Sequence, residues 1–226
     1  MRFDIITIFP NLFDSFLDES LIKKSALNRV NTFFVHDLRR WAKGKYKTVD
    51  ERPYGGGAGM VLMAEPIIKA VKEIKTKILK TRASKKIKVI LLTPAGKEFN
   101  QKTAKRLAKF DSLILICGRY EGVDERIGKF VDEKISIGPY VLSGGETAAM
   151  VIVETVARLS PGYMGNPNSL NEESFESDLI EYPHYTRPEV LKVDSKNYRV
   201  PKVLLSGDHK KIKDWRQKNI KIIKKK

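Results

Sequence analysis

The sequence predicts an α/β fold in which helices cover both faces of a parallel sheet. Apolar runs without alternation are typical of strands that are buried on both faces. The central part of the chain has three such runs: residues 87–92, 113–117 and 135–137. A segment that we predict to be helical follows each run: residues 100–109, 123–130 and 146–159. Because parallel strands are joined by crossovers that are usually helical, this alternation favours the α/β class.

The N-terminal part of the chain predicts further elements of the same kind. Apolar runs at residues 3–8 and 32–38 predict two more strands. Between them, apolar residues recur at helical spacing over residues 13–21. Residues 43–64 include a cluster of glycines and predict no regular structure. Pro66 suits the first turn of a further helix.

Three loops rich in turn residues follow the three central strands, at residues 93–96, 118–122 and 138–145. Ligands of open α/β sheets bind beyond the carboxyl ends of the strands, so these loops form the candidate site. Glycine-rich loops suit a neutral adenosine that is held by main-chain hydrogen bonds. Ordinary turn glycines are the alternative explanation of the same pattern.

The distribution of charge favours a polyanionic partner. The formal net charge is +16 over 226 residues. Residues 69–88 carry nine lysines and arginines against one acid, and residues 192–226 carry thirteen against three. Each phosphate that such side chains neutralise releases a counterion, which favours nucleic acid as the partner. A lysine-rich bias that only raises solubility is the alternative.

Several classes of site are excluded by motifs that the sequence lacks. It has no Walker A loop, no H-E-x-x-H and no G-x-S-x-G, and its glycine cluster at residues 55–59 does not fit G-x-G-x-x-G. The three histidines are too scattered for a metal triad, so we expect no metal site. Cys117 is the only cysteine and cannot form an internal disulfide. Without a signal peptide or an apolar span, we expect a cytoplasmic protein with no membrane partner.

Six stretches of the chain together resemble one enzyme family. Three of them are similar to the signature of the TrmD family, the tRNA (guanosine-37-N1) methyltransferases: CGRYEGVDERI (117–127), SIGPYVLSGGE (136–146) and PHYTRPEV (183–190). Three others also resemble that family: FDIITIFPNLF (3–13), RPYGGGAGMV (52–61) and LLSGDHKKIKDWR (204–216). The resemblance covers essentially the whole chain, with the motifs in the correct order.

The resemblance implies a fold of the SPOUT class, with a deep trefoil knot in the C-terminal half of the α/β domain. It also implies a homodimer in which each active site is built from both subunits. Residues 1–160 then form the methyltransferase domain and residues 161–178 a linker. Residues 179–226 form a small, helical and basic domain that binds the anticodon branch of tRNA.

The cofactor that the resemblance implies is S-adenosylmethionine, bent in the knot against the three loops. The residues that match the family's cofactor contacts all lie in these loops: Thr93, Pro94, Gly96, Gly118, Tyr120, Glu121, Ile137, Gly138, Pro139, Tyr140, Val141, Leu142, Gly144 and Gly145. The family also suggests Mg²⁺, although no metal-binding spacing is visible in the sequence.

Two side chains carry the catalytic roles that the resemblance implies. Neutral guanine holds a proton on N1, so a carboxylate is needed to remove it. Where the family usually has Asp-Ser-Phe, this chain has Glu173-Ser174-Phe175, and Glu173 is the predicted base, with Glu172 and Asp178 as rivals. Arg158 matches the arginine that stabilises the negative charge growing on O6. A solvated acidic linker without a catalytic role is the alternative.

Two other functions stay open from the sequence. A related knotted methyltransferase that acts on a ribose 2′-hydroxyl needs no carboxylate to free a ring nitrogen. A catalytically silent RNA-binding protein keeps the knot for stability alone, but the intact loops and Arg158 favour an enzyme. Tyr185, Thr186 and Arg187 follow the linker, and we expect them to hold the tRNA or its target base.

Overall fold

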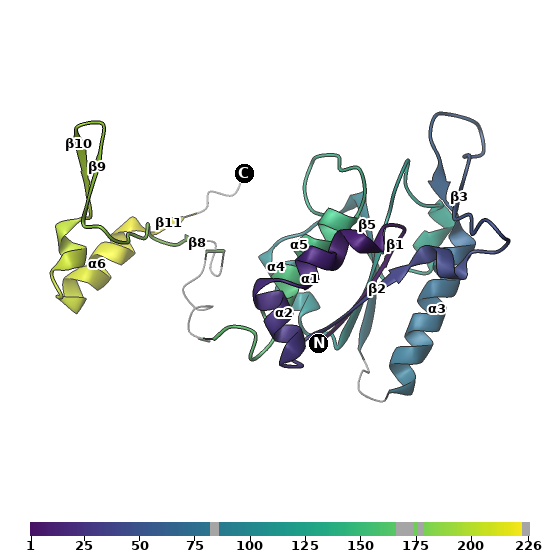
Figure 1. Cartoon of the computed structure of the whole chain (residues 1–226), viewed down its shortest axis with the longest axis horizontal. Coiled ribbons are helices and arrows are strands. Elements are labelled where there is room, and N and C mark those ends of the chain that lie inside the picture. The colour runs from purple at the N-terminus through teal and green to yellow at the C-terminus, as the bar shows by residue number, and fades with distance from the viewer. Residues whose placement is uncertain (82–85, 166–173, 176–178, 223–226) are drawn as a thin grey trace. The chain divides into compact units, whose positions relative to one another are not determined.

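The computed structural model describes residues 1–81, 86–165, 174–175 and 179–222 of the chain (Figure 1). The chain divides into two compact units, Met1–Gly165 and Asn166–Lys226. The predicted base Glu173 and its rivals Glu172 and Asp178 lie outside the described residues.

A five-stranded parallel sheet forms the centre of the first unit. Its strand order is β2-β1-β6-β5-β7, and all neighbouring strands are parallel. The strands are β1 (Arg2–Thr7), β2 (Thr32–Asp37), β5 (Ile87–Glu98), β6 (Ser112–Cys117) and β7 (Glu133–Ser136). The five predicted strands are therefore confirmed, and with them the α/β class.

Helices cover both faces of this sheet (Figure 1). They are α1 (Asp14–Leu17), α2 (Ser20–Leu27), α3 (Ala64–Lys80), α4 (Gln101–Leu107) and α5 (Glu146–Ala157), with short 3-10 segments η1 (Pro10–Phe13) and η2 (Leu38–Trp41). Side chains of α2, α4 and α5 join the buried cluster on one face, and those of α3 join the cluster on the other. This arrangement leaves the carboxyl edge of the sheet to the loops.

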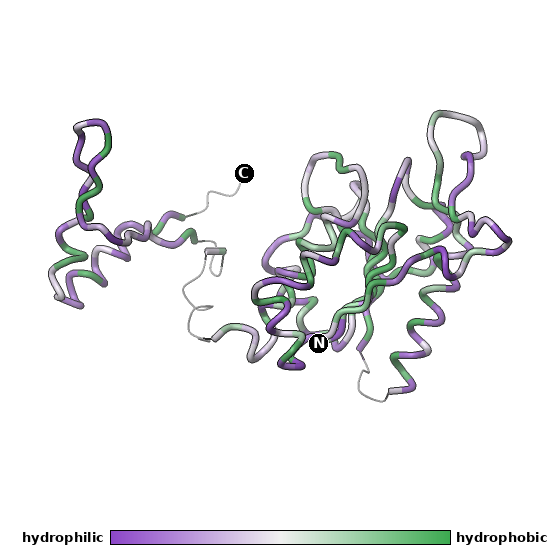
Figure 2. Tube along the Cα trace, in the orientation of Figure 1, coloured by the Kyte–Doolittle hydropathy of each residue, from purple (hydrophilic) through white to green (hydrophobic). Residues whose placement is uncertain are grey.

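Strand β6 shows why the central strands are continuously apolar. Leu113 and Leu115 belong to the cluster on the α5 face, whereas Ile114 and Ile116 belong to the cluster on the α3 face. Every residue of β6 is buried. Figure 2 accordingly shows the strands of the sheet mainly in the hydrophobic colour. A strand that is covered on both sides has no position for a solvated side chain.

Two predicted helices differ from the structure. The helix predicted over residues 13–21 is wrong as a single helix, because α1 ends at Leu17 and α2 begins at Ser20. Glu19 is extended there, and Ser20 has a φ of 55°, so the helical path is interrupted. The segment predicted as helix over residues 123–130 forms only a short 3-10 helix, η3 (Glu125–Lys129).

Two predicted loops are partly extended. The stretch 43–64 contains β3 (Asp50–Glu51), which pairs antiparallel with β4 (Val61–Leu62). Strand β5 also continues through the loop predicted at residues 93–96. Its Leu92 and Lys97 both pair with Ile135 of β7, so residues 93–96 form a bulge within the strand.

The second unit consists of short elements in its described residues. They are β8 (Leu179–Ile180), β9 (Val190–Val193), β10 (Lys196–Arg199), η5 (Lys202–Leu205), α6 (His209–Asn219) and β11 (Lys221–Ile222). The helix predicted near residues 208–219 is α6, and the Asp208 side chain caps it by accepting a hydrogen bond from the Lys211 amide at 3.0 Å. The description of this region as helical was incomplete, because β9 and β10 form an antiparallel hairpin.

Candidate functional site

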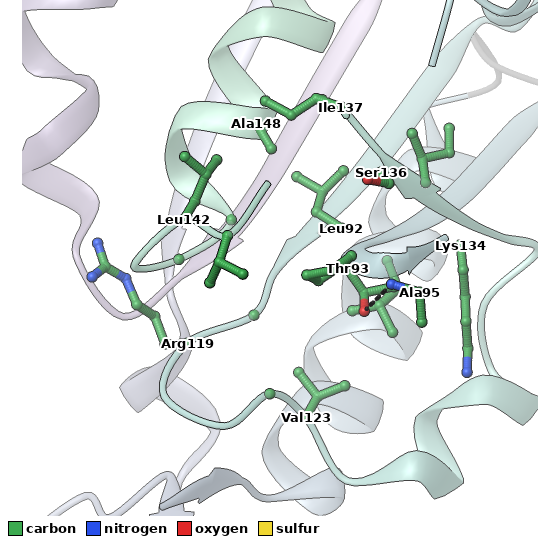
Figure 3. Close-up of a pocket in the computed structure, with 18 of the residues that line it drawn as sticks. Leu92, Thr93, Ala95, Arg119, Val123, Lys134, Ser136, Ile137, Leu142 and Ala148 are labelled. Atoms are coloured by element: carbon green, nitrogen blue, oxygen red, sulfur yellow. Dashed lines mark hydrogen bonds between the residues drawn. The ribbon is translucent and has the colours of Figure 1, made fainter. Parts of the chain in front are cut away.

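A cavity of about 380 Å³ lies at the carboxyl edge of the sheet (Figure 3). Three segments line it: the end of β5 with its bulge, the loop after β6 and the loop after β7. Its volume lies within the range of about 300 to 1,000 Å³ that is typical of small-molecule sites. Its place in the fold is the one that the sequence predicted for the candidate site.

Most residues that we predicted to contact a cofactor line this cavity. Twelve of the fourteen do so: Thr93, Pro94, Gly118, Tyr120, Glu121, Ile137, Gly138, Tyr140, Val141, Leu142, Gly144 and Gly145. Gly96 and Pro139 are not among the lining residues. Pro139 is exposed, and Gly96 serves the packing of β5 on β7, since a Cβ there would overlap the backbone of Ile135. The structure thus brings loops from three parts of the chain to one cavity.

The loop after β7, residues 137–145, crosses closely over the end of β6. The amide of Gly145 donates a hydrogen bond to the carbonyl of Gly118 at 2.8 Å. A Cβ at Gly145 would lie 2.8 Å from Cα of Cys117, a separation that real Cβ atoms essentially never show. The crossing therefore requires glycine, and this explains one glycine of the S-G-G-E motif in physical terms.

Local contacts hold the shape of residues 137–145. The hydroxyl of Tyr140 donates a hydrogen bond to the carbonyl of Ile137 at 3.0 Å, and the Tyr140 amide donates one to the carbonyl of Gly138 at 3.0 Å. Gly138 has a φ of +154°, and the Tyr140 ring lies where a Cβ of Gly138 would be. The side chain of Val141 is 88% exposed, so this loop presents an apolar residue to its surroundings.

A charged pair that the sequence did not predict lies beside the cavity. Glu146, the first residue of α5, is 2% exposed, and its carboxylate accepts a hydrogen bond from the Thr7 hydroxyl at 2.7 Å. The same carboxylate accepts a hydrogen bond from Nε of Arg119 at 2.8 Å, and Arg119 lines the cavity. Both residues lie inside motifs that carry the family resemblance, next to predicted cofactor contacts. Their position in those motifs was the signal that could have identified them.

Cys117 lies under the crossing loops. Burial raises the pKa of its thiol well above the usual range, and the charge of Glu146 adds to this effect. The thiol is therefore protonated at neutral pH and is a poor nucleophile. Cys117 acts here as a core residue, since its side chain belongs to the cluster on the α5 face.

The glycine-rich segment 52–61 reaches the cavity through Glu121. The amide of Glu121 donates a hydrogen bond to the carbonyl of Met60 at 3.0 Å. Its side chain packs so closely on Gly59 that a Cβ at Gly59 would have no room, and Gly59 has a φ of +82°. Through these contacts Glu121 joins a fourth segment to the wall of the cavity.

Arg158 lies at the other end of α5 from the cavity. The helix has 12 residues, and a rise of about 1.5 Å per residue makes it about 18 Å long. Arg158 caps its C-terminal end, is half-buried, and is not among the residues that line the cavity. Within one chain, the structure does not bring the predicted catalytic arginine to the predicted cofactor loops.

The described part of the chain has neither a cluster of metal-ligating side chains nor a helix that could span a membrane. It contains no group of three or more His, Cys, Asp or Glu side chains that could hold a metal ion. Within the same residues, no helix combines the length and the apolar character needed to cross a bilayer.

A parallel sheet with a glycine-lined cavity at its carboxyl edge is the architecture of α/β proteins that hold a small ligand beyond the ends of their strands. A family model described as "tRNA (Guanine-1)-methyltransferase TrmD" matches residues 1–225. The chain belongs to this family, so the resemblance that the sequence motifs indicated is confirmed.

Curated relatives agree over nearly the full chain. A tRNA (guanine-N(1)-)-methyltransferase of Dictyoglomus turgidum is 49% identical over 96% of this chain and 84% of its own length. The protein of the same name from Clostridioides difficile is 45% identical over 99% of this chain and 94% of its own length. That of Listeria monocytogenes is 47% identical over 96% of this chain and 86% of its own.

Proposed function

We propose that this chain transfers the methyl group of S-adenosylmethionine to N1 of guanosine 37 in tRNA. Membership of the family supports methylation of guanine N1 in tRNA, and a methyltransferase of this family implies S-adenosylmethionine as the donor. In the structure, the observation that carries the proposal is the glycine-lined cavity at the carboxyl edge of the sheet, where two motifs of the family, residues 117–127 and 136–146, meet the end of β5.

The cavity fits S-adenosylmethionine in the chemistry of its walls. Gly118, whose Cβ position meets only ordinary contacts, lets the backbone approach a ligand closely, so main-chain groups there can bind the edge of an adenine. Leu92, Val123 and Ile135 supply apolar walls for the flat ring. When bound, S-adenosylmethionine supplies a methyl group that its sulfonium already activates. The residues of the chain then have to align donor and acceptor.

Two side chains of this chain act on the guanine in the proposed reaction. Glu173 removes the proton from N1, which frees the lone pair that takes the methyl group. Arg158 donates charge-assisted hydrogen bonds to O6, where negative charge grows as the proton leaves. Tyr185, Thr186 and Arg187 help to hold the target base.

The proposed active site is shared between two copies of the chain. Arg158 follows α5 at its C-terminal end, about 15 Å along the helix from Ala148, which lines the cavity, so we propose that one copy does not present both to one guanine. A homodimer in which the cavity of one subunit faces Arg158 and Glu173 of the other resolves this separation. The proposed knot agrees with the tight crossing of residues 137–145 over the end of β6, beside Gly118.

The basic C-terminal region is the proposed grip on tRNA. Residues 192–226 carry thirteen lysines and arginines against three acids, which suits contact with phosphates of the anticodon branch. We place the methyltransferase domain at residues 1–160, the linker at 161–178 and the tRNA-binding domain at 179–226, in a cytoplasmic enzyme. Mg²⁺ has no cluster of ligands among the described residues, so no step is assigned to it.

Matched variants test the proposed base. Glu173→Gln keeps size and polarity but cannot accept the proton, so methyl transfer to a guanosine-37 transcript falls by about 100-fold or more. Glu172→Gln and Asp178→Asn change neighbouring carboxylates and leave the rate within about threefold of wild type. If Glu173→Gln stays active while one of these controls loses its activity, the carboxylate changed in that control is the base instead of Glu173.

Mixing two inactive variants tests the shared site. Arg158→Ala removes the proposed arginine, and Ala95→Trp fills the cavity from an exposed position on the β5 bulge. After the two are unfolded and refolded together in equal amounts, half of the dimers hold one intact site, and about a quarter of wild-type activity returns. If the mixture stays as inactive as its components, each site is built within one chain and the dimer proposal is wrong.

A further inference from the structure

Glu146 and Arg119 form an ion pair at the start of α5, and the Glu146 carboxylate in it is buried. A carboxylate that is 2% exposed loses its hydration and is tolerated only when its oxygens are paired. Both oxygens of Glu146 are paired: Oε1 accepts a hydrogen bond from Thr7 and Oε2 accepts one from Arg119. Apolar residues of similar size often stabilise a core as well as a buried ion pair does. Stability alone is therefore a weak reason for this arrangement.

Arg119 connects three segments that meet at the cavity. Its Nε binds Glu146 at the start of α5, and its Nη1 donates a hydrogen bond to the carbonyl of Ser143 at 3.3 Å. Its guanidinium carbon lies 4.6 Å from the centre of the Phe9 ring, just after β1. The loop after β6 is thereby joined to the loop after β7 and to the end of β1.

The side chain of Arg119 supports loop 137–145 from beside the cavity. Figure 3 shows Arg119 at the rim, with its guanidinium directed away from Thr93, Ala95 and Lys134. A Cβ at Gly144 would overlap both Arg119 and Glu146, so the loop rests directly on this pair. The guanidinium thus contacts loop 137–145, which lines the cavity, and points away from Thr93 and Ala95 on the β5 bulge.

We propose that Arg119 and Glu146, with Thr7 as the third member, are positioning residues that hold loop 137–145 in the shape that binds the cofactor. This inference rests on the proposed assignment of the cavity to S-adenosylmethionine. Arginine is required because Nε and Nη1 reach two acceptors at once, whereas a lysine has a single ammonium on a flexible stem. Thr7 fixes the carboxylate on which Arg119 depends.

Cofactor binding and turnover of the whole chain, measured separately, test this proposal. Arg119→Lys is expected to raise both the Kd of S-adenosylmethionine, by calorimetry, and its KM by about tenfold or more, with kcat at saturation within about threefold. Thr7→Val removes the hydroxyl at equal size and is expected to raise the Kd and the KM of S-adenosylmethionine as well. Thr7→Ser keeps the hydroxyl and is expected to have wild-type values of both. The KM for tRNA stays unchanged in all three variants.

A second buried ion pair provides the matched control. Arg2 pairs with Asp4, which is fully buried in β1, and Arg2 does not line the cavity. Arg2→Lys is expected to leave the Kd of S-adenosylmethionine unchanged, although it alters an ion pair in the same unit. The proposal is overturned if Arg119→Lys leaves that Kd within twofold, or if Arg2→Lys raises it equally.

A cavity-filling variant separates this inference from the assignment on which it rests. Ala95→Trp is expected to abolish binding of S-adenosylmethionine, because Ala95 lines the cavity. If it binds as tightly as wild type, the cofactor site is elsewhere and the proposed site fails. If it does not bind, while Arg119→Lys binds normally, the site stands and the positioning role alone is wrong.

Discussion

The two units of the chain differ in how much side-chain surface they bury. In the first unit, apolar side chains form a cluster on each face of the sheet, and Phe3 and Leu115 have no exposed surface. In the second unit, every described side chain is at least partly exposed. Burial normally offsets the entropy that is lost when a chain becomes ordered. The first unit therefore has a core that can stabilise it, whereas local contacts hold the described residues of the second unit, and we propose that bound tRNA adds to its order.

The local contacts of the second unit are themselves suited to RNA. The rings of Tyr182 and Tyr185 lie 6.5 Å and 6.2 Å from that of Trp215, and Arg216 lies 4.9 Å from the centre of the Tyr182 ring. Partly exposed aromatic rings and guanidinium groups stack on unpaired bases and contact phosphates. These side chains are therefore candidates for the contacts with tRNA that we propose for this unit.

The largest expected effect separates the two units by core truncation. Phe3→Ala removes a fully buried ring and is expected to lower the free energy of unfolding by about 3 to 5 kcal/mol. Tyr198→Ala removes a ring that is 56% exposed, and the change is expected to stay within about 0.5 kcal/mol. Urea unfolding measures both, because the two tryptophans, Trp41 and Trp215, report on the first and second units. Equal losses in the two variants would contradict the comparison.

Binding of tRNA is expected to protect the second unit more than the first. Without tRNA, limited proteolysis cuts the second unit first, because few buried contacts oppose its local opening. At a tRNA concentration 100 times the Kd, opening is suppressed by about 100-fold, and cleavage there slows accordingly. Mass spectrometry of the fragments locates the cuts. Cleavage in the first unit before the second, or no slowing with tRNA, would show that the second unit is ordered by itself.

A smaller effect concerns acid stability of the first unit. Burial alone would raise the pKa of Asp4, but hydrogen bonds from Arg2 and His36 outweigh it, so the pKa lies below its ordinary value of 3.8. A carboxyl with a depressed folded-state pKa stabilises the fold above its unfolded pKa, and this contribution is lost as the pH falls below about 3.8 towards the folded value. In Asp4→Asn, the midpoint of urea unfolding is therefore expected to fall less steeply as the pH is lowered through this range. Asp18→Asn, at an exposed ion pair, is the control and keeps the wild-type slope.

Local patterns predicted the sheet and the place of its ligand site. Strand β6 is apolar at nearly every position because both its faces are buried, and this is visible in a short window of sequence. The loops that follow such strands meet at one edge, so the place of the cavity could be predicted, and twelve of the residues that the resemblance implied as cofactor contacts line it. The family resemblance, and not periodicity, selected the individual residues.

Contacts between distant segments account for what the sequence did not predict. The bulge at residues 93–96 depends on two positions of β5 pairing with Ile135, and no local pattern specifies that register. Glu146 is polar at the edge of a core, and only its contacts with Thr7 and Arg119, 139 and 27 residues away in sequence, explain its burial. The separation of Arg158 from the cavity likewise follows from the length of α5 between them.

The most direct test of the central claim is methyl transfer from labelled S-adenosylmethionine to two tRNA transcripts that differ only at position 37. After digestion to nucleosides, the guanosine-37 transcript is expected to yield labelled 1-methylguanosine, and the adenosine-37 transcript is expected to yield no label. Ala95→Trp is expected to yield no label on either transcript. Label on a ribose, equal label on both transcripts, or full activity of Ala95→Trp would contradict the proposed reaction or its site.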